Sequence, residues 1–109
     1  MAQAALRRKR PLTASACFHA QQCAEKYLKA ILVAQGHLFP RTHDLLALHT
    51  LCVQVGVISG IPLDRLESLS AYAVQVRYPG EDPTPEETKE ALDAARVVRR
   101  FVRKLLGVH

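Results

Sequence analysis

The sequence predicts an all-α protein: an antiparallel up-and-down four-helix bundle with a short extra helix at its N-terminus. Apolar residues recur every three to four positions through most of the chain, which is the period of an amphipathic helix. Ala and Leu are abundant, whereas the chain has no Trp, three Phe and three Tyr. This composition favours helices over a β-sandwich. Gly and Pro separate the periodic stretches and mark their ends.

The N-terminal stretch is short and basic. Ala2–Arg10 predicts a short helix that Pro11 ends, because proline has no amide donor and clashes with the preceding turn. The stretch contains the basic run Arg7–Arg10 and little apolar surface. We therefore expect residues 1–12 to form a mobile basic segment and residues 13–109 to form the bundle.

Capping residues mark the bundle helices. Thr13 or Ser15 can cap the first and Asp44 the second. Gly36 and Gly56 are suited to the C-terminal ends of these two helices. The predicted spans are 13–35, 45–55, 63–78 and 85–106.

The last helix has the clearest start. Thr84 is suited to the N-cap, Pro85 to the first helical position, and Glu87 completes a capping box. Acidic residues lead this helix and basic residues end it, which complements the helix dipole. Its expected core residues are Ala91, Leu92, Ala95, Val98, Val102 and Leu105.

Charge and cysteine content limit the function classes. The net charge is +5, with a second basic cluster between Arg96 and Lys104. Such clusters attract nucleotides or nucleic acid, although a solvated face with a dipole-matched helix end is an equal alternative. The three cysteines have no CxxC spacing, so we expect buried reduced thiols, no metal site and no cofactor. No apolar run is long enough for a membrane span and no secretory signal is evident, so a cytoplasmic location is expected.

The stretch Cys17–Ala30 is unusually rich in polar groups for an amphipathic helix. Its apolar stripe is flanked by a polar stripe and by a third face that carries Gln21 and Glu25. A solvated face usually mixes Glu and Lys, so amide and imidazole groups here indicate polar groups that have partners. The polar stripe consists of His19, Gln22, Lys26 and Lys29.

These residues resemble a known family. Phe18–Ala30 is similar to the signature helix of HEPN domains, and Phe39–Leu45 is similar to the loop that follows it. Tyr72–Gly80 resembles the end of the third core helix of that family, and Pro85–Ala91 resembles the start of its last helix. The resemblance implies a dimeric helical bundle with nucleotide or RNA chemistry at the dimer cleft. It also implies pairing with a separate minimal nucleotidyltransferase, in a toxin–antitoxin-like module whose HEPN partner is often a ribonuclease.

The chain departs from the ribonuclease members of that family. Those members carry an Arg, a spacer of four to six residues and then a His. Arg77 stands at the position of the Arg, but residues 78–84 contain no His. Metal-independent RNA cleavage needs groups that move protons and stabilise phosphate charge, so we expect no efficient ribonuclease activity.

Three groups of residues are candidate ligand contacts. Arg77 can clamp a phosphate and Tyr78 can stack a base; the alternative is a helix-end Arg and a core Tyr. Arg41 and His43 lie beside a helix start, where anions are favoured, although loop fixing is the stronger interpretation. The polar stripe with His19, Gln22 and Lys26 would either line a ligand cleft or form a polar seam at a helix or subunit interface. We favour the polar seam.

The sequence therefore predicts a homodimeric nucleotide- or RNA-binding protein. The alternative is a degenerate ribonuclease that uses Arg77 with His43 or His19. A third hypothesis is an interaction protein whose polar seam is only a dimer surface.

Overall fold

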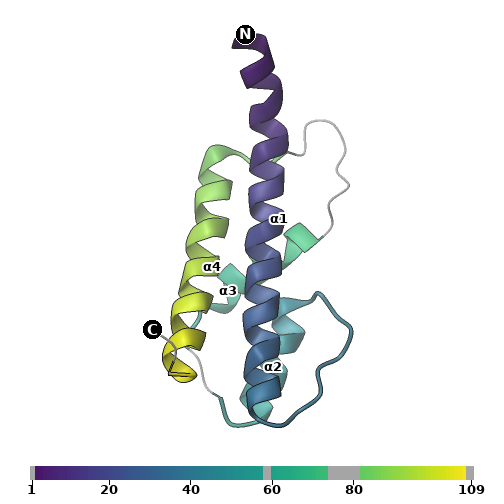
Figure 1. The fold of residues 1–109 in the computed structure, drawn as a ribbon, viewed down its shortest axis with the longest axis vertical. Helices are drawn as coiled ribbons and strands as arrows, with labels where there is room; N and C mark the ends of the chain where they lie inside the picture. The colour runs from purple at the N-terminus through teal and green to yellow at the C-terminus, as the bar shows by residue number, and fades with distance from the viewer. Residues whose placement is uncertain (1, 58–59, 74–81, 108–109) are drawn as a thin grey trace.

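The computed structural model describes residues 2–57, 60–73 and 82–107, with side chains described from Thr13 onward. The elements are α1 (Ala2–Ala34), α2 (Leu45–Gln54), α3 (Leu63–Ser70), the 3-10 turn η1 (Ala71–Ala73) and α4 (Pro85–Leu105) (Figure 1). These residues contain no strand. The all-helical bundle that the sequence predicts is confirmed.

Helix α1 is the central element, and it corrects the prediction at Pro11. The 33-residue helix runs from Ala2 through Pro11 to Ala34 without a break, so the expected separate N-terminal helix is its first part. A proline in a helix interior costs about 3 kcal/mol because one hydrogen bond is lost. Helix α1 is nonetheless continuous, and its downstream half is fixed by packing against α2 and α4.

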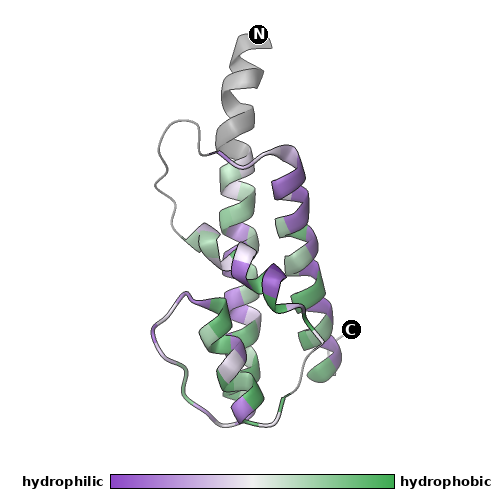
Figure 2. Ribbon diagram, turned by 180° about the vertical axis from the view of Figure 1, so that it is seen from behind, coloured by the Kyte–Doolittle hydropathy of each residue, from purple (hydrophilic) through white to green (hydrophobic). Residues whose placement is uncertain are grey.

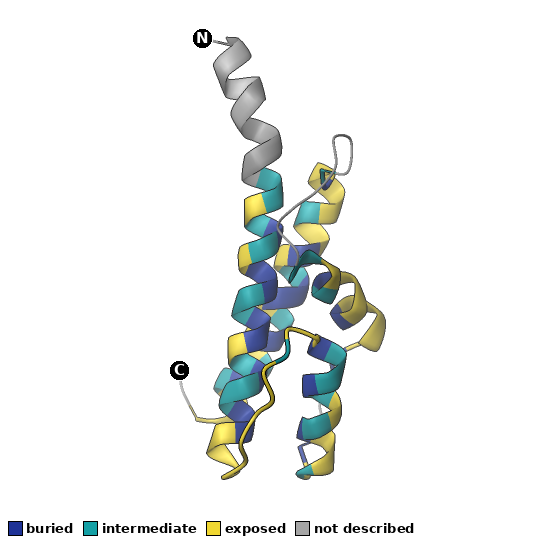
Figure 3. Ribbon diagram, turned by 90° about the vertical axis from the view of Figure 1, so that its right-hand side faces the viewer, coloured by how far each residue is buried: buried dark blue, intermediate teal, exposed yellow. Residues whose placement is uncertain are grey.

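The helices do not alternate strictly in direction. Gln21 of α1 contacts His43 just before α2, and Leu28 of α1 contacts Cys52 near the end of α2. Helices α1 and α2 therefore run the same way, as does α4 (Figure 1). Helix α3 runs opposite to α4, since its start lies beside residues 93–94 of α4 and Tyr72, after its end, lies near Glu87. The connection over residues 35–44 is long enough for this, since each extended residue spans about 3.3 Å. This loop returns along α1, and almost all of it is exposed (Figure 3).

The core lies where α2, α3 and α4 meet α1. The α4 side chains expected there are buried except for Leu92 and Leu105, which are 37% and 43% exposed. Those two expectations were wrong because the buried stripe of α4 is narrower than assumed. It includes Ala94, which was not expected in the core. The largest fully buried apolar side chains are Leu28, Ile31, Leu32, Leu45, Leu48, Leu66, Leu69, Val98 and Val102.

Most predicted helix ends are confirmed. The Asp44 side chain accepts from two amides of α2, and Thr84 and Glu87 form the capping box of α4. Gly36 takes a positive φ of 75°, which ends α1 and turns the chain into the loop. The third predicted helix was too long: α3 ends at Ser70 and a 3-10 turn follows. The predicted site residues Arg77 and Tyr78 lie outside the described residues.

Helix α3 offers a matched pair of leucines for testing the core. Leu66 is fully buried, whereas Leu63, one turn earlier, is 56% exposed. We expect Leu66→Ala to lower the free energy of unfolding by about 2–5 kcal/mol, through lost burial and a cavity. Leu63→Ala should cost far less. Urea denaturation followed by circular dichroism measures both, and equal losses would contradict the assigned core.

Candidate functional site

A buried carboxylate lies at the centre of the polar contacts between α1 and the loop before α2. Glu25 of α1 is only 5% exposed, and Gln21, one turn earlier, is fully buried. The two share a face because they are four residues apart on a helix. Burying a carboxylate is costly unless it is paired, so the surrounding contacts decide whether this arrangement is stable.

Both carboxylate oxygens of Glu25 have partners. Oε2 accepts from Nζ of Lys29 at 3.0 Å, and Oε1 lies 2.7 Å from Nδ1 of His43. Gln21 Nε2 also reaches Oε1, at 3.4 Å. Every buried side-chain nitrogen and oxygen in the described part of the chain has a hydrogen-bond partner. The network is therefore fully satisfied, which is the condition under which buried polar groups stabilise a fold.

The contacts lower the pKa of Glu25. Burial alone would raise it, but the hydrogen bonds from His43 and Lys29, together with their charges, outweigh burial. The carboxyl is thus ionised at neutral pH, and an ionised carboxylate only accepts hydrogen bonds. The hydrogen of the contact must lie on His43 Nδ1, and in the neutral ring Nε2 then carries the lone pair.

The backbone around His43 is also held by hydrogen bonds. Its carbonyl accepts from Gln21 Nε2 at 2.9 Å and from Ser70 Oγ of α3 at 3.4 Å. The next residue is the Asp44 cap, whose amide donates to Thr42 Oγ1. Helices α1, α2 and α3 therefore converge on one residue, while the His43 side chain remains 68% exposed.

A shallow, largely apolar groove of about 500 Å³ lies along α1 beside this network. The Phe39 ring closes it from the loop, and Lys29 Nζ lies 5.0 Å from the ring centroid. Lys29 thereby connects the buried carboxylate to the aromatic wall. The groove is lined by Lys26, Lys29, Ala30, Val33, Ala34 and Phe39.

The structure brings some of the predicted site residues together. Gln22 Nε2 donates to Gln21 Oε1 at 2.8 Å and so belongs to the same network as His43. Lys26 is exposed at the groove, one turn from Gln22. Arg41 is exposed on the loop, two residues before His43. Gln22 and His43 therefore belong to one network, Lys26 lies at the groove, and Arg41 lies on the loop that carries His43.

His19 is exposed nearer the N-terminus of α1, where its ring stacks edge-on with Phe18 at 5.9 Å between centroids. The hydrogen bonds of the Glu25 network do not include His19, so the structure does not join His19 to the other predicted residues.

The sequence interpretation missed the residues that matter most here, Gln21, Glu25 and Phe39. A signal was present for Gln21. Positions 17, 21, 24, 28 and 31 follow the alternating four-and-three spacing of a core-facing helix stripe, and Gln21 stands within it. A polar residue at a core position indicates a buried partner. Phe39 carried no periodic signal because it lies in a loop.

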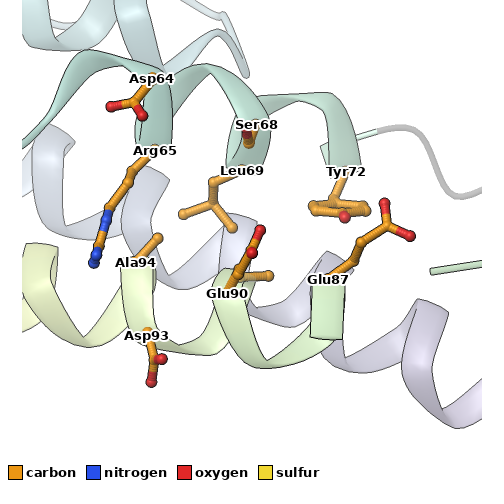
Figure 4. Close-up of a pocket in the computed structure, with 10 residues that line it drawn as sticks. Asp64, Arg65, Ser68, Leu69, Tyr72, Glu87, Glu90, Asp93 and Ala94 are labelled. Atoms are coloured by element: carbon orange, nitrogen blue, oxygen red, sulfur yellow. The ribbon is translucent and has the colours of Figure 1, made fainter. Parts of the chain in front are cut away.

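A second groove, of about 340 Å³, lies between α3 and α4 (Figure 4). Arg65 reaches from α3 toward α4, and the Tyr72 ring lies beside Glu87. None of the predicted site residues in the described part of the chain lines this groove. Its carboxylates outnumber its one guanidinium, which disfavours a phosphate ligand. These carboxylates belong to Asp64, Glu87, Glu90 and Asp93.

The described residues contain no group of three or more His, Cys, Asp or Glu side chains placed to hold a metal ion. The three cysteines are free thiols, with Cys17 and Cys52 buried. Burial raises the pKa of the Cys52 thiol, so it remains protonated. None of the described helices is long and apolar enough to cross a membrane.

Comparison with protein families decides the class. The model of the HEPN domain family matches residues 1–105. The chain belongs to the HEPN family. Its membership points to nucleotide or RNA binding, or to ribonuclease-type chemistry. No curated protein and no solved structure gave a match.

The Glu25 network predicts a specific pH dependence of stability. Because the pKa of Glu25 in the folded protein lies below its ordinary value of 4.5, the network stabilises the fold above that pH. The contribution is lost as the pH falls through the lowered pKa. We expect the wild type to lose more unfolding free energy than Glu25→Gln between pH 6 and pH 3.

At neutral pH, Glu25→Gln should itself cost about 1–3 kcal/mol, because the charge is lost and one of the two acceptor oxygens becomes an NH2 group that cannot accept from His43 or Lys29. Glu67→Gln, at an exposed position on α3, is the matched control. Urea midpoints measured across the pH range test both statements. A wild type and Glu25→Gln variant with parallel pH profiles would show that Glu25 is not held as an ion.

Proposed function

We propose that this HEPN-family chain binds nucleotide or RNA as a homodimer, without efficient ribonuclease activity. The observation that carries the proposal is the contact of His43 with Glu25. It holds the loop over residues 35–44 against α1 and so keeps the aromatic and basic side chains of the groove in place.

The groove has the chemistry that a nucleotide needs. Phe39 and the apolar side chains of α1 offer a surface on which a base can stack. Lys26 lies at the same groove, and Arg41 lies on the same loop, where each can meet a phosphate. The exposed His43 ring adds a hydrogen-bonding group beside them.

The exposed apolar residues near the groove support a dimer. Val33 is 58% exposed, Leu38 97% and Phe39 44%. A chain of 109 residues builds only a small core, and a second copy would cover these side chains. Dimerisation would also place two groups of basic side chains near one another, which suits a polyanionic ligand.

A minimal nucleotidyltransferase is the partner that the family resemblance implies, in a toxin–antitoxin-like module. We include this pairing in the proposal because the chain belongs to the HEPN family. Cytoplasmic location is part of the same proposal.

A second candidate function is a degenerate ribonuclease, and one observation favours it. With Nδ1 fixed by a buried carboxylate, the exposed His43 ring presents Nε2 for proton transfer, in the manner of a base oriented by a third group. Arg77, lying outside the described residues, would be its phosphate-binding partner.

Calorimetry tests the binding proposal with two ligands, ATP and a short single-stranded RNA. We expect heat with at least one of them. Lys26→Ala combined with Phe39→Ala should weaken binding about tenfold or more, because stacking and one charge are lost. Lys89→Ala combined with Val53→Ala removes one exposed cation and one exposed apolar side chain elsewhere and should leave affinity unchanged. Absence of heat with both ligands at high protein concentration removes the proposal.

An RNA degradation assay separates the two candidate functions. We expect no cleavage by the wild type above the level of buffer. If cleavage is seen, and if it is lost in His43→Ala and in Arg77→Ala but kept in His37→Ala, the ribonuclease is established instead. His37 is the matched control because it is exposed on the same loop.

A further inference from the structure

We propose that an arginine ridge on α4 binds the phosphate backbone of single-stranded RNA. The ridge consists of Arg96, Arg99, Arg100 and Arg103. It is a second anion-binding surface, on a different helix from the groove beside Glu25. The inference rests on the proposed function. It identifies the ligand as an RNA chain, because a mononucleotide could not contact both the groove and the ridge.

The four side chains meet in one shallow hollow of about 410 Å³ on the outer face of α4. They are spaced three, four and seven residues apart, which places them on one side of a helix. Arg96 and Arg103 are about 10.5 Å apart along the axis, at 1.5 Å per residue. That length accommodates more than one phosphate. Figure 2 shows that the hydrophilic side of α4 faces away from the bundle.

The ridge has little counter-charge of its own. Within the described residues, Arg96 is the only one of the four with an ion pair, to Asp93 at 3.4 Å. The sequence has no carboxylate between Asp93 and the end of α4. Like charges at this spacing destabilise a helix, so the ridge has an electrostatic cost that an anionic ligand would relieve.

The helix dipole does not account for the ridge. The dipole favours cations only within the last turn, where Arg103 and Lys104 already lie. Arg96, Arg99 and Arg100 lie before that turn. A face present only for solubility would mix acidic and basic residues, as the first half of α4 does.

The side-chain chemistry indicates phosphate-backbone contact without base recognition. A guanidinium forks onto phosphate oxygens in two-pronged fashion, which the point charge of a lysine does not reproduce. The described residues that line the hollow include no aromatic ring, so stacking is left to the groove at Phe39. Contact with the ridge should therefore be independent of sequence and strongly dependent on salt.

The test measures binding of a labelled twenty-nucleotide single-stranded RNA by fluorescence anisotropy over a range of salt concentrations. Arg99→Gln combined with Arg103→Gln keeps good helix formers and removes two charges. We expect affinity to fall about tenfold, and the slope of log K against log salt to decrease by about 1.4 for two lost phosphate contacts. Calorimetry with ATP should give the wild-type affinity.

Arg65→Gln combined with Lys89→Gln is the control, because it removes the same net charge from exposed positions elsewhere. A ridge variant that behaves like this control overturns the inference. So does polyglutamate that displaces RNA at equal charge concentration, since the ridge would then suit acidic proteins. A wild type that binds ATP but not RNA overturns the ridge and leaves the proposed function standing, whereas binding of neither ligand removes both.

Discussion

The contact between the Glu25 carboxylate and the His43 ring, at 2.7 Å, is the interaction on which the site depends. It joins a buried position on α1 to a loop that is otherwise exposed. A buried carboxylate without this partner would be destabilising, and a loop without this anchor would have few contacts to hold it. Each side of the contact therefore makes the other stable.

The direction of α2 and the position of the groove follow from that anchor. Because the loop returns along α1 before α2 begins, α2 runs parallel to α1 and packs Cys52 against Leu28. The same return brings Phe39 beside Lys29 and closes one wall of the groove. The groove proposed as the binding surface therefore depends on the polar network that holds the loop against α1.

The sequence predicted the features that depend on local chemistry. The Asp44 cap, the Thr84 capping box and the turn at Gly36 are confirmed, because each is determined by a few neighbouring residues. The continuation of α1 through Pro11 was not predicted, since the local cost of a proline in a helix, about 3 kcal/mol, does not by itself decide where a helix begins. Leu92 was predicted to be buried but is exposed, because periodicity shows which side of a helix faces the core but not how wide the buried stripe is.

The candidate site was only partly predictable for a related reason. His43, Gln22 and Lys26 were identified from their chemistry, but the contacts that organise them depend on where the loop crosses α1. Glu25 was placed on a separate face of the helix, and nothing in its spacing showed that an imidazole would reach it from eighteen residues away. Family membership then adds the functional class that neither periodicity nor geometry supplies.

The most direct test of the account is the tautomer of His43, measured by long-range proton–nitrogen correlation NMR at slightly alkaline pH. The account predicts that the His43 hydrogen lies on Nδ1, with Nε2 unprotonated, and that Glu25→Gln lowers the population of this tautomer. His37, exposed on the same loop, should be unaffected by the substitution. A His43 ring that matches His37 and does not respond to Glu25→Gln would contradict the account.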